Sequence, residues 1–255
     1  MIVTWQQLGR FGNNMFQYAL ARVIADKFNL DYKTDKNFDE EETHYSGFYN
    51  EFLKLDEKHN LDISSFYAIR EDNIKNLLSL SKEEFINSNF NSKNLRLEGY
   101  FQDNILFTGK DIKKYFKIDD SKILKTDDDD LCLSLRLGSD FKCNDWVINP
   151  DIIIDFLENI FFKQLIIVTD VYDSLILDKF KRFSPIIYNN NSSKPIKDFY
   201  TLMSFKNLII TNSTFSYWAA VLGRSNTIYA LKNWKFNSLS DIIGKENKTI
   251  LYPHE

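Results

Sequence analysis

The second half of the chain alternates short apolar segments with segments of helical pattern, and this alternation constrains the fold more than any other feature. Strands and helices of this length in alternation predict parallel βαβ units. The run Leu165-Ile166-Ile167-Val168 is apolar throughout, which is typical of a strand in a sheet covered on both faces. We expect strands at 131–137, 165–168, 186–188, 208–211 and 227–231, and helices at 149–161, 172–183, 197–204 and 215–222, the last with Gly223 as its C-cap.

The first half opens in the same way. A short apolar strand is followed by a turn with two glycines and then by apolar residues at three- and four-residue spacing, which predicts a helix. Residues 35–92 are polar and are expected to be mostly helix and loop. The expected elements are strands at 2–5, 31–34 and 95–100 and helices at 14–28, 72–78, 82–86 and 104–116.

Four successive aspartates, residues 127–130, mark the clearest change in composition. Because like charges at this density repel one another, we expect a solvated linker here. The alternative, a metal-binding motif, needs carboxylates that converge from a fixed turn, and nothing in the segment fixes one. The 255 residues suffice for two domains. We expect an N-terminal α/β domain at 1–125 and a C-terminal Rossmann-like domain at 126–255, with a cleft between them.

Composition excludes several classes of protein. The net charge of −4 argues against a chain whose main task is to bind nucleic acid. Two cysteines cannot build a disulfide framework, and no His or Cys spacing resembles a zinc site. The first residues lack a basic leader, and no apolar stretch approaches the ~20 residues of a membrane span. We therefore expect a cytoplasmic protein, for which peripheral contact with a membrane stays open.

Ligands of open α/β sheets bind at the carboxyl ends of the strands, so the segments that follow strands are the candidate site. Gly9-Arg10-Phe11-Gly12-Asn13-Asn14 follows the first expected strand. Two glycines let the backbone approach a ligand closely, and the following helix N-terminus offers N–H groups to an anion. The segment is neither a Walker phosphate loop nor a Gly-x-Gly-x-x-Gly dinucleotide turn. The alternative interpretation is a tight turn with a solvated Arg10.

Arg136 lies at the end of an otherwise apolar strand, in Leu135-Arg136-Leu137-Gly138-Ser139-Asp140-Phe141. Burial of an unpaired guanidinium is costly, so this side chain should pair with Asp140, lie on an exposed face or point into a ligand site. The planar fork of guanidinium donors suits a phosphate.

Two more strand ends carry polar side chains. Val168-Thr169-Asp170 offers a carboxylate that could accept hydrogen bonds from a base or ribose hydroxyl, or could cap the next helix. Thr211-Asn212-Ser213-Thr214-Phe215 leads into a helix. Its hydroxyl and N–H groups could hold a phosphate, and Ser213 or Thr214 could equally be an ordinary N-cap.

Together, the segments at 9–14, 135–141 and 211–220 and the motif Glu98-Gly99-Tyr100-Phe101-Gln102 resemble the bacterial-type α-1,2-fucosyltransferases, glycosyltransferase family 11. The Gly-Arg-Phe-Gly-Asn piece also looks like the opening of protein O-fucosyltransferases. The resemblance implies a GT-B fold, with two Rossmann-like domains that face each other across a cleft. It implies transfer of L-fucose from GDP-β-L-fucose to a hydroxyl of a glycan acceptor, with inversion and in α-1,2 linkage, and no metal or other cofactor.

The resemblance also assigns roles to residues. The N-terminal domain would be the acceptor side and the C-terminal domain the donor side. Arg136 would neutralise the leaving diphosphate, and Asp140 lies in the same motif and is the second candidate catalytic residue. The candidate donor-binding residues are Gly9, Arg10, Gly12, Asn13, Asn14, Ser134, Thr169, Asp170, Asn212, Ser213, Thr214 and Phe215.

Departures from the family pattern leave alternatives open. The central motif is commonly His-x-Arg-Arg-Gly-Asp in the family, whereas Ser134 replaces the His, Leu137 replaces the second Arg and Ser139 is inserted here. With one guanidinium fewer, another GDP- or dTDP-deoxyhexose donor is conceivable, as is a non-catalytic relative that binds a nucleotide sugar or glycan. His44 and the acidic residues within 39–42 are candidates for a general base, and the alternative for each is an ordinary surface residue.

Overall fold

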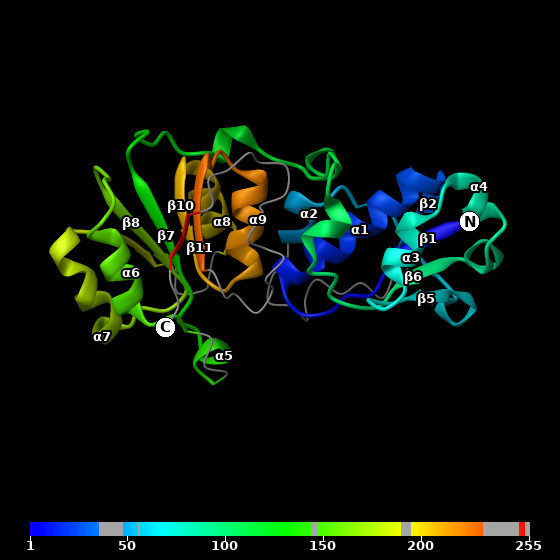
Figure 1. Cartoon of the computed structure of the whole chain (residues 1–255), viewed down its shortest axis with the longest axis horizontal. Coiled ribbons are helices and arrows are strands. Elements are labelled where there is room, and N and C mark those ends of the chain that lie inside the picture. Colours follow the sequence, from blue (N-terminus) through cyan, green and yellow to red (C-terminus); the bar gives the residue numbers. More distant parts are fainter. Residues whose placement is uncertain (36–47, 56, 144–146, 190–194, 232–249, 253–255) are drawn as a thin grey trace. The chain divides into compact units, whose positions relative to one another are not determined.

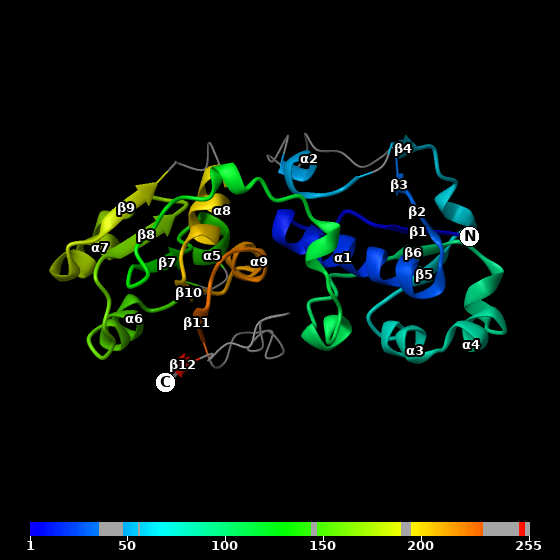
Figure 2. The same cartoon turned by 90° about the horizontal axis from the view of Figure 1, so that it is seen from above.

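The computed structural model describes residues 1–35, 48–55, 57–143, 147–189, 195–231 and 250–252, without the side chains of residues 48, 140, 141, 231 and 250–252. The chain divides into two compact units, Met1–Ile118 and Asp119–Glu255 (Figures 1 and 2). Both are α/β units built on parallel sheets. No helix of the described ranges is both long and apolar enough to cross a membrane.

The N-terminal unit is built on a four-stranded parallel sheet in the order β2-β1-β6-β5. Its strands are β1 (Ile2–Trp5), β2 (Asp31–Tyr32), β5 (Tyr67–Ile69) and β6 (Leu95–Leu97), with β3 (Thr34–Asp35) and β4 (Lys58–His59) as a separate parallel pair. Its helices are α1 (Phe11–Phe28), α2 (Phe48–Phe52), α3 (Ile74–Ser79) and α4 (Lys82–Ile86), and 3₁₀ turns occur at Ile63–Ser65, Asn89–Ser92, Asn104–Phe107 and Lys113–Tyr115.

Several sequence expectations for this unit need correction. The expected helix at 104–116 is wrong: two 3₁₀ turns stand there, separated at Gly109, whose φ of +68° is incompatible with a continuous right-handed helix. The strand expected at 95–100 ends at Leu97, because a tight turn with Phe101 at φ +53° follows. Helix α1 begins at Phe11, three residues before the expected start, so the Gly-Asn-Asn segment forms its first turn.

The C-terminal unit is built on a six-stranded parallel sheet in the order β12-β11-β10-β7-β8-β9. Counted from β7, this is the strand order 6-5-4-1-2-3 of the Rossmann fold. Its strands are β7 (Leu131–Leu135), β8 (Leu165–Thr169), β9 (Ile186–Asn189), β10 (Asn207–Ile210), β11 (Thr227–Leu231) and β12 (Ile250–Tyr252). Its helices are α5 (Ser139–Lys142), α6 (Pro150–Leu157), α7 (Ser174–Leu177), α8 (Pro195–Ser204) and α9 (Thr214–Leu222), with 3₁₀ turns at Asp120–Lys122 and Asp178–Phe183.

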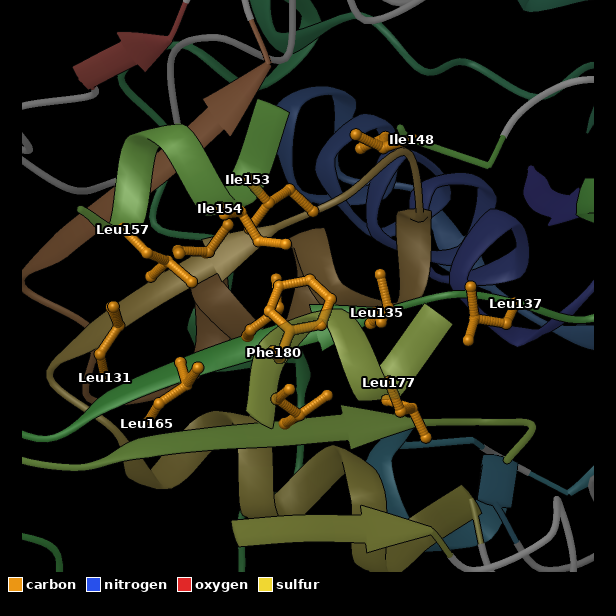
Figure 3. Close-up of a cluster of buried hydrophobic side chains, with 13 residues drawn as sticks. Leu131, Leu135, Leu137, Ile148, Ile153, Ile154, Leu157, Leu165, Leu177 and Phe180 are labelled. Carbon is orange, nitrogen blue, oxygen red and sulfur yellow. The ribbon is translucent and has the colours of Figure 1, made fainter. Parts of the chain in front are cut away.

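Both faces of the sheet are buried at the central strands β7 and β8, as their continuously apolar sequences predicted, whereas the residues of β9 are half-buried or exposed. Leu131, Leu133 and Leu135 point to one face and pack in a core cluster with α6 and α7 residues such as Ile153 and Leu177 (Figure 3). The intervening residues of β7, including Cys132, point to the opposite face, where they are also buried. Gly223 is the C-cap of α9, as expected. Its φ of −79° needs no glycine, but an added Cβ would lie 2.6 Å from the Met203 backbone.

The four aspartates at 127–130 lie just before β7 in the C-terminal unit. They are solvated, as expected, but lysines balance part of their charge: Asp127 pairs with Lys163, and Asp128 pairs with Lys206 at 2.5 Å. Asn207 Nδ2 also donates to the carbonyls of Asp128 and Asp130. The segment is therefore a turn tied to the amino edge of the sheet.

Candidate functional site

The order of strands in the C-terminal sheet reverses between β7 and β10. The chain runs outward from β7 to β8 and β9 and returns to β10 on the other side of β7. Ligands of such sheets bind outside the carboxyl ends of the strands at this switch point. Arg136 directly follows β7, and Thr211 directly follows β10. The two most informative sequence segments of this unit thus flank its switch point.

An ion pair joins the ends of β7 and β8. Arg136 Nη1 lies 2.9 Å from Asp170 Oδ2, with 23% and 12% of the two side chains exposed. The other oxygen, Asp170 Oδ1, accepts the backbone N–H of Leu137 at 2.7 Å. One carboxylate therefore orients the guanidinium and fixes the turn that carries it. A guanidinium has five N–H donors, more than this ion pair uses, so Arg136 can be held by Asp170 and also face an anion.

Leu137, which replaces the family's second arginine, belongs to the hydrophobic core. It is 1% exposed and packs in the cluster that includes Leu135 and Leu177 (Figure 3). An arginine could not take this side-chain position without burying its charge among apolar neighbours. The apolar packing around Leu137 therefore disfavours an arginine at this position.

The turn from β10 into α9 offers backbone donors at the switch point. Ser213 is the N-cap of α9, yet its side chain makes no capping hydrogen bond to the helix. The first N–H groups of α9 are therefore not satisfied by the N-cap side chain, which suits an anion at this end of the helix. Asn212 Oδ1 is buried, and no donor of the described residues reaches it. A buried amide oxygen of this kind calls for a donor, such as a ligand hydroxyl.

Three other candidate residues of this unit point into the structure. Ser134 is 7% exposed, and its carbonyl accepts from Thr211 Oγ1 at 2.8 Å. Thr169 is 1% exposed, and its hydroxyl donates to the Val171 carbonyl at 3.0 Å. The Phe215 ring packs edge-on against Phe199 with centroids 5.0 Å apart. These residues therefore support the strand ends and the α9 start that carry the candidate site.

The Leu8–Asn14 turn of the N-terminal unit is held by two amide side chains of its own helix. Asn14 Nδ2 donates to the carbonyls of Leu8, Gly9 and Arg10 at 3.3, 3.0 and 3.0 Å. Gln17 Nε2 donates to the Leu8 carbonyl at 2.9 Å, and its Oε1 accepts the Leu8 N–H at 3.2 Å. Asn14 and Gln17 are fully buried. Asn14, expected to line the ligand site, holds the turn instead, whereas Gly9 and Arg10 are exposed.

The Glu98–Gln102 motif forms a second turn beside the first one. Gln102 Nε2 donates to Asn13 Oδ1 at 2.8 Å, which joins this turn to the first turn of α1. Glu71, which follows β5, accepts the backbone N–H groups of Tyr100 and Phe101 on one carboxylate oxygen at 2.9 and 3.1 Å. Sequence reasoning missed Glu71 and Gln17, since neither the polar 35–92 region nor the helical pattern marks them out.

Some sequence candidates are not placed. The side chain of Asp140, in α5, lies outside the described residues, as do His44 and residues 39–42. Within the described ranges, no group of three or more His, Cys, Asp and Glu side chains could hold a metal ion. Burial raises the pKa of the Cys132 thiol well above its ordinary value, so this residue is no nucleophile at neutral pH.

Comparison with known proteins bears on these two units. Residues 178–248 match the sequence profile described as Glycosyl transferase family 11. No curated protein matches the chain. Among solved structures, a mutant of FUT1 from Arabidopsis thaliana in complex with GDP is 13% identical, with a TM-score of 0.52 over 90% of this chain and 70% of that one.

Two further fucosyltransferases show the same likeness. POFUT1 in complex with GDP-fucose is 10% identical, with a TM-score of 0.52 over 88% of this chain and 95% of that one. NodZ from Bradyrhizobium is 13% identical, with a TM-score of 0.50 over 87% of this chain and 93% of that one. The chain has a GT-B-like fold. The expected resemblance to glycosyltransferase family 11 is confirmed. At these identities the structural likeness concerns the fold, so the chemistry rests on the residues of the site.

Proposed function

We propose that the chain is a GDP-fucose-dependent glycosyltransferase that transfers L-fucose to a hydroxyl of a glycan acceptor. The observation that carries the proposal is the placement of Arg136, oriented by Asp170, at the switch point of a Rossmann sheet beside the N-terminus of α9. The family 11 match over 178–248 and the GDP- and GDP-fucose-bound neighbours support the donor. The donor diphosphate would lie between Arg136 and the Asn212–Thr214 turn.

The proposed reaction is an inverting displacement in α-1,2 linkage. The acceptor hydroxyl oxygen forms a bond to the anomeric carbon of fucose while the bond from that carbon to the β-phosphate oxygen breaks. The electron pair of the broken bond stays on GDP, and the hydroxyl proton passes to solvent or to a base. Negative charge grows on the β-phosphate in the transition state, where a fixed guanidinium and helix N–H donors stabilise it without reorganisation.

A second candidate function follows from Leu137. The core position of this residue removes one guanidinium from the motif, which favours either a different deoxyhexose nucleotide or a relative that binds a nucleotide sugar without turnover. The Arg136–Asp170 pair suits a diphosphate in each of these functions, so turnover of GDP-fucose is what distinguishes them.

The experiment that decides between these functions is a thermal-shift panel with GDP, UDP, CMP, dTDP and GDP-fucose, followed by a GDP-release assay with GDP-fucose. A ligand at 100 times its Kd stabilises a protein by about 2.7 kcal/mol, which moves Tm by degrees. We expect GDP and GDP-fucose to raise Tm and GDP-fucose to be turned over. A shift by dTDP or UDP alone would replace the donor, and binding without turnover would establish the non-catalytic relative.

We further propose that turnover needs no metal. EDTA should leave the rate of GDP release unchanged. Loss of activity that Mg²⁺ or Mn²⁺ restores would contradict this proposal and would direct attention to residues 127–130.

A further inference from the structure

We propose that Tyr100 is the stacking platform for an acceptor saccharide, held beside the Gly9 turn by Glu71. The inference rests on the proposed function and names the part of the N-terminal unit that receives the second substrate. The Glu98–Gln102 motif has no part in donor binding as proposed above, so its elaborate fixation calls for another explanation.

The 99–101 turn has an unusual backbone conformation that two features hold in place. Phe101 adopts φ +53°, a left-handed conformation that is unfavourable for a bulky residue, and its side chain is only 1% exposed. Glu71 Oε1 accepts two consecutive N–H groups, those of Tyr100 and Phe101. A Cβ on Gly99 would lie 3.1 Å from Glu71 Cγ, so the glycine lets the glutamate lie close. The buried Phe101 side chain and the two hydrogen bonds to Glu71 thus fix the backbone on both sides of Tyr100.

The Tyr100 ring is exposed and lies beside Gly9. The residue is 46% exposed, although its neighbour in sequence is fully packed. A Cβ added to Gly9 would lie 3.0 Å from Tyr100 Cε1, so the ring stands beside the glycine of the β1 turn. Gln102 ties the same turn to Asn13. The fixation therefore presents an aromatic ring to solvent at the carboxyl edge of the sheet.

An exposed aromatic ring suits a saccharide. The face of an aromatic ring is negative and apolar, which suits the C–H face of a pyranose, while amide groups suit its hydroxyls. An acceptor hydroxyl must reach the anomeric carbon of the transferred sugar. An acceptor that binds to the N-terminal unit, the side that the resemblance assigns to it, would meet Tyr100 as an exposed ring at the carboxyl edge of the sheet.

The test measures transfer of radiolabelled fucose from GDP-fucose to lactose, cellobiose, maltose and chitobiose, with the preferred disaccharide carried forward. In Tyr100→Ala we expect KM for that disaccharide to rise about 3- to 10-fold, the size of one lost stacking contact, with KM for GDP-fucose unchanged. Tyr100→Phe keeps the ring and should restore the wild-type KM. Tyr172→Ala is the matched control, because Tyr172 is a 59% exposed tyrosine of the C-terminal unit.

Glu71 supplies an independent variant. Glu71→Ala removes the carboxylate that accepts the Tyr100 and Phe101 N–H groups. It should raise KM for the disaccharide as Tyr100→Ala does. Glu71→Gln keeps an acceptor oxygen and should stay close to wild type. Unfolding midpoints of all variants show whether the fold is kept, and Tyr100→Ala, which removes an exposed ring, is expected to unfold like the wild type.

Three outcomes would overturn the proposal. Tyr100→Ala could leave KM for the disaccharide unchanged, it could raise KM for GDP-fucose instead, or the wild type could transfer fucose to no disaccharide of the panel while it hydrolyses GDP-fucose. Each leaves the proposed donor chemistry standing. A wild-type chain that neither binds nor turns over GDP-fucose would instead remove the proposed function and the platform with it.

Discussion

Two strand-end turns, Leu8–Asn14 in the first unit and the turn after β7 in the second, are fixed with different chemistry. The Leu8–Asn14 turn is held by neutral amides, Asn14 and Gln17, from the helix that follows it directly. The turn after β7 is held by a carboxylate, Asp170, from the end of the neighbouring strand. The neutral ties fix the backbone of the first turn without a charged group, and the Arg10 side chain of that turn is exposed. The charged tie also orients the Arg136 guanidinium at the edge where an anion is expected.

The largest expected effect tests the neutral tie. Asn14→Asp replaces an NH2 group, which lies within hydrogen-bond distance of three carbonyls, with a buried carboxylate that faces them, and it should cost about 3–5 kcal/mol of unfolding free energy. Urea unfolding of the whole chain measures it. Asn13→Asp is the matched control: Oδ1 of Asn13 accepts from Gln102, which an aspartate can also do, so we expect a cost of about 1 kcal/mol or less. Equal costs at both positions would show that the turn does not depend on Asn14 as a donor.

The next effect concerns the charge held by the second turn. Arg136→Ala should lower kcat about 10²- to 10³-fold, as for loss of one donor to a developing oxyanion. It should also cost about 1–3 kcal/mol of unfolding free energy, because the largely buried Asp170 carboxylate loses its cation. Arg136→Lys keeps the positive charge but loses the planar set of guanidinium donors. Its kcat should lie between those of the wild type and Arg136→Ala. Arg182→Ala, which removes an exposed arginine of the same unit that pairs with Glu158, is the control. A near-normal kcat in Arg136→Ala would remove Arg136 from the reaction.

A smaller effect separates positioning from charge. Arg136 and the Leu137 N–H meet different oxygens of Asp170, and in Asp170→Asn an NH2 donor replaces one of these oxygens and faces one of the two donors. The loss of transition-state stabilisation, measured from kcat/KM, should be about 1–2 kcal/mol. Asp173→Asn is the matched control. Asp173 also pairs with a cation, Lys142 at 2.8 Å, and a hydrogen bond from that lysine lowers its pKa. Because Asp173 caps α7, a role that asparagine fills equally well, its variant should keep full activity.

The smallest expected effect compares two glycines of the first unit. Gly9 and Gly109 both have φ near +70°, but an added Cβ meets Asn13 Nδ2 at 2.3 Å at Gly9 and nothing within 4 Å at Gly109. Gly109→Ala should cost about 1 kcal/mol of unfolding free energy, the price of the left-handed conformation alone. Gly9→Ala should cost more, because Asn13 must also move. Urea midpoints of the two variants measure the difference, and indistinguishable midpoints would mean that Asn13 gives way freely.

Sequence reasoning succeeded where periodicity was long and failed where single contacts decide. The strands expected at 2–5, 165–168 and 227–231 follow from apolar runs and are found there, the second one residue longer, and the family motifs led to the correct fold. The helix expected at 104–116 was wrong, because its apolar spacing says nothing of the backbone conformation at Gly109. The partners of Arg136 and Tyr100 could not be predicted, since Asp170 and Glu71 meet them only after the strands have aligned.

The burial of Leu137 has a consequence for ionic strength. Attraction between exposed charges weakens as salt screens them, whereas hydrogen bonds from backbone N–H groups are much less affected. If the diphosphate meets one guanidinium and the amides that open α9, its affinity should fall less steeply with salt than in relatives with two arginines. This low salt sensitivity would be set by the hydrophobic core, because no arginine can replace Leu137 unless the neighbours Leu135 and Leu177 repack.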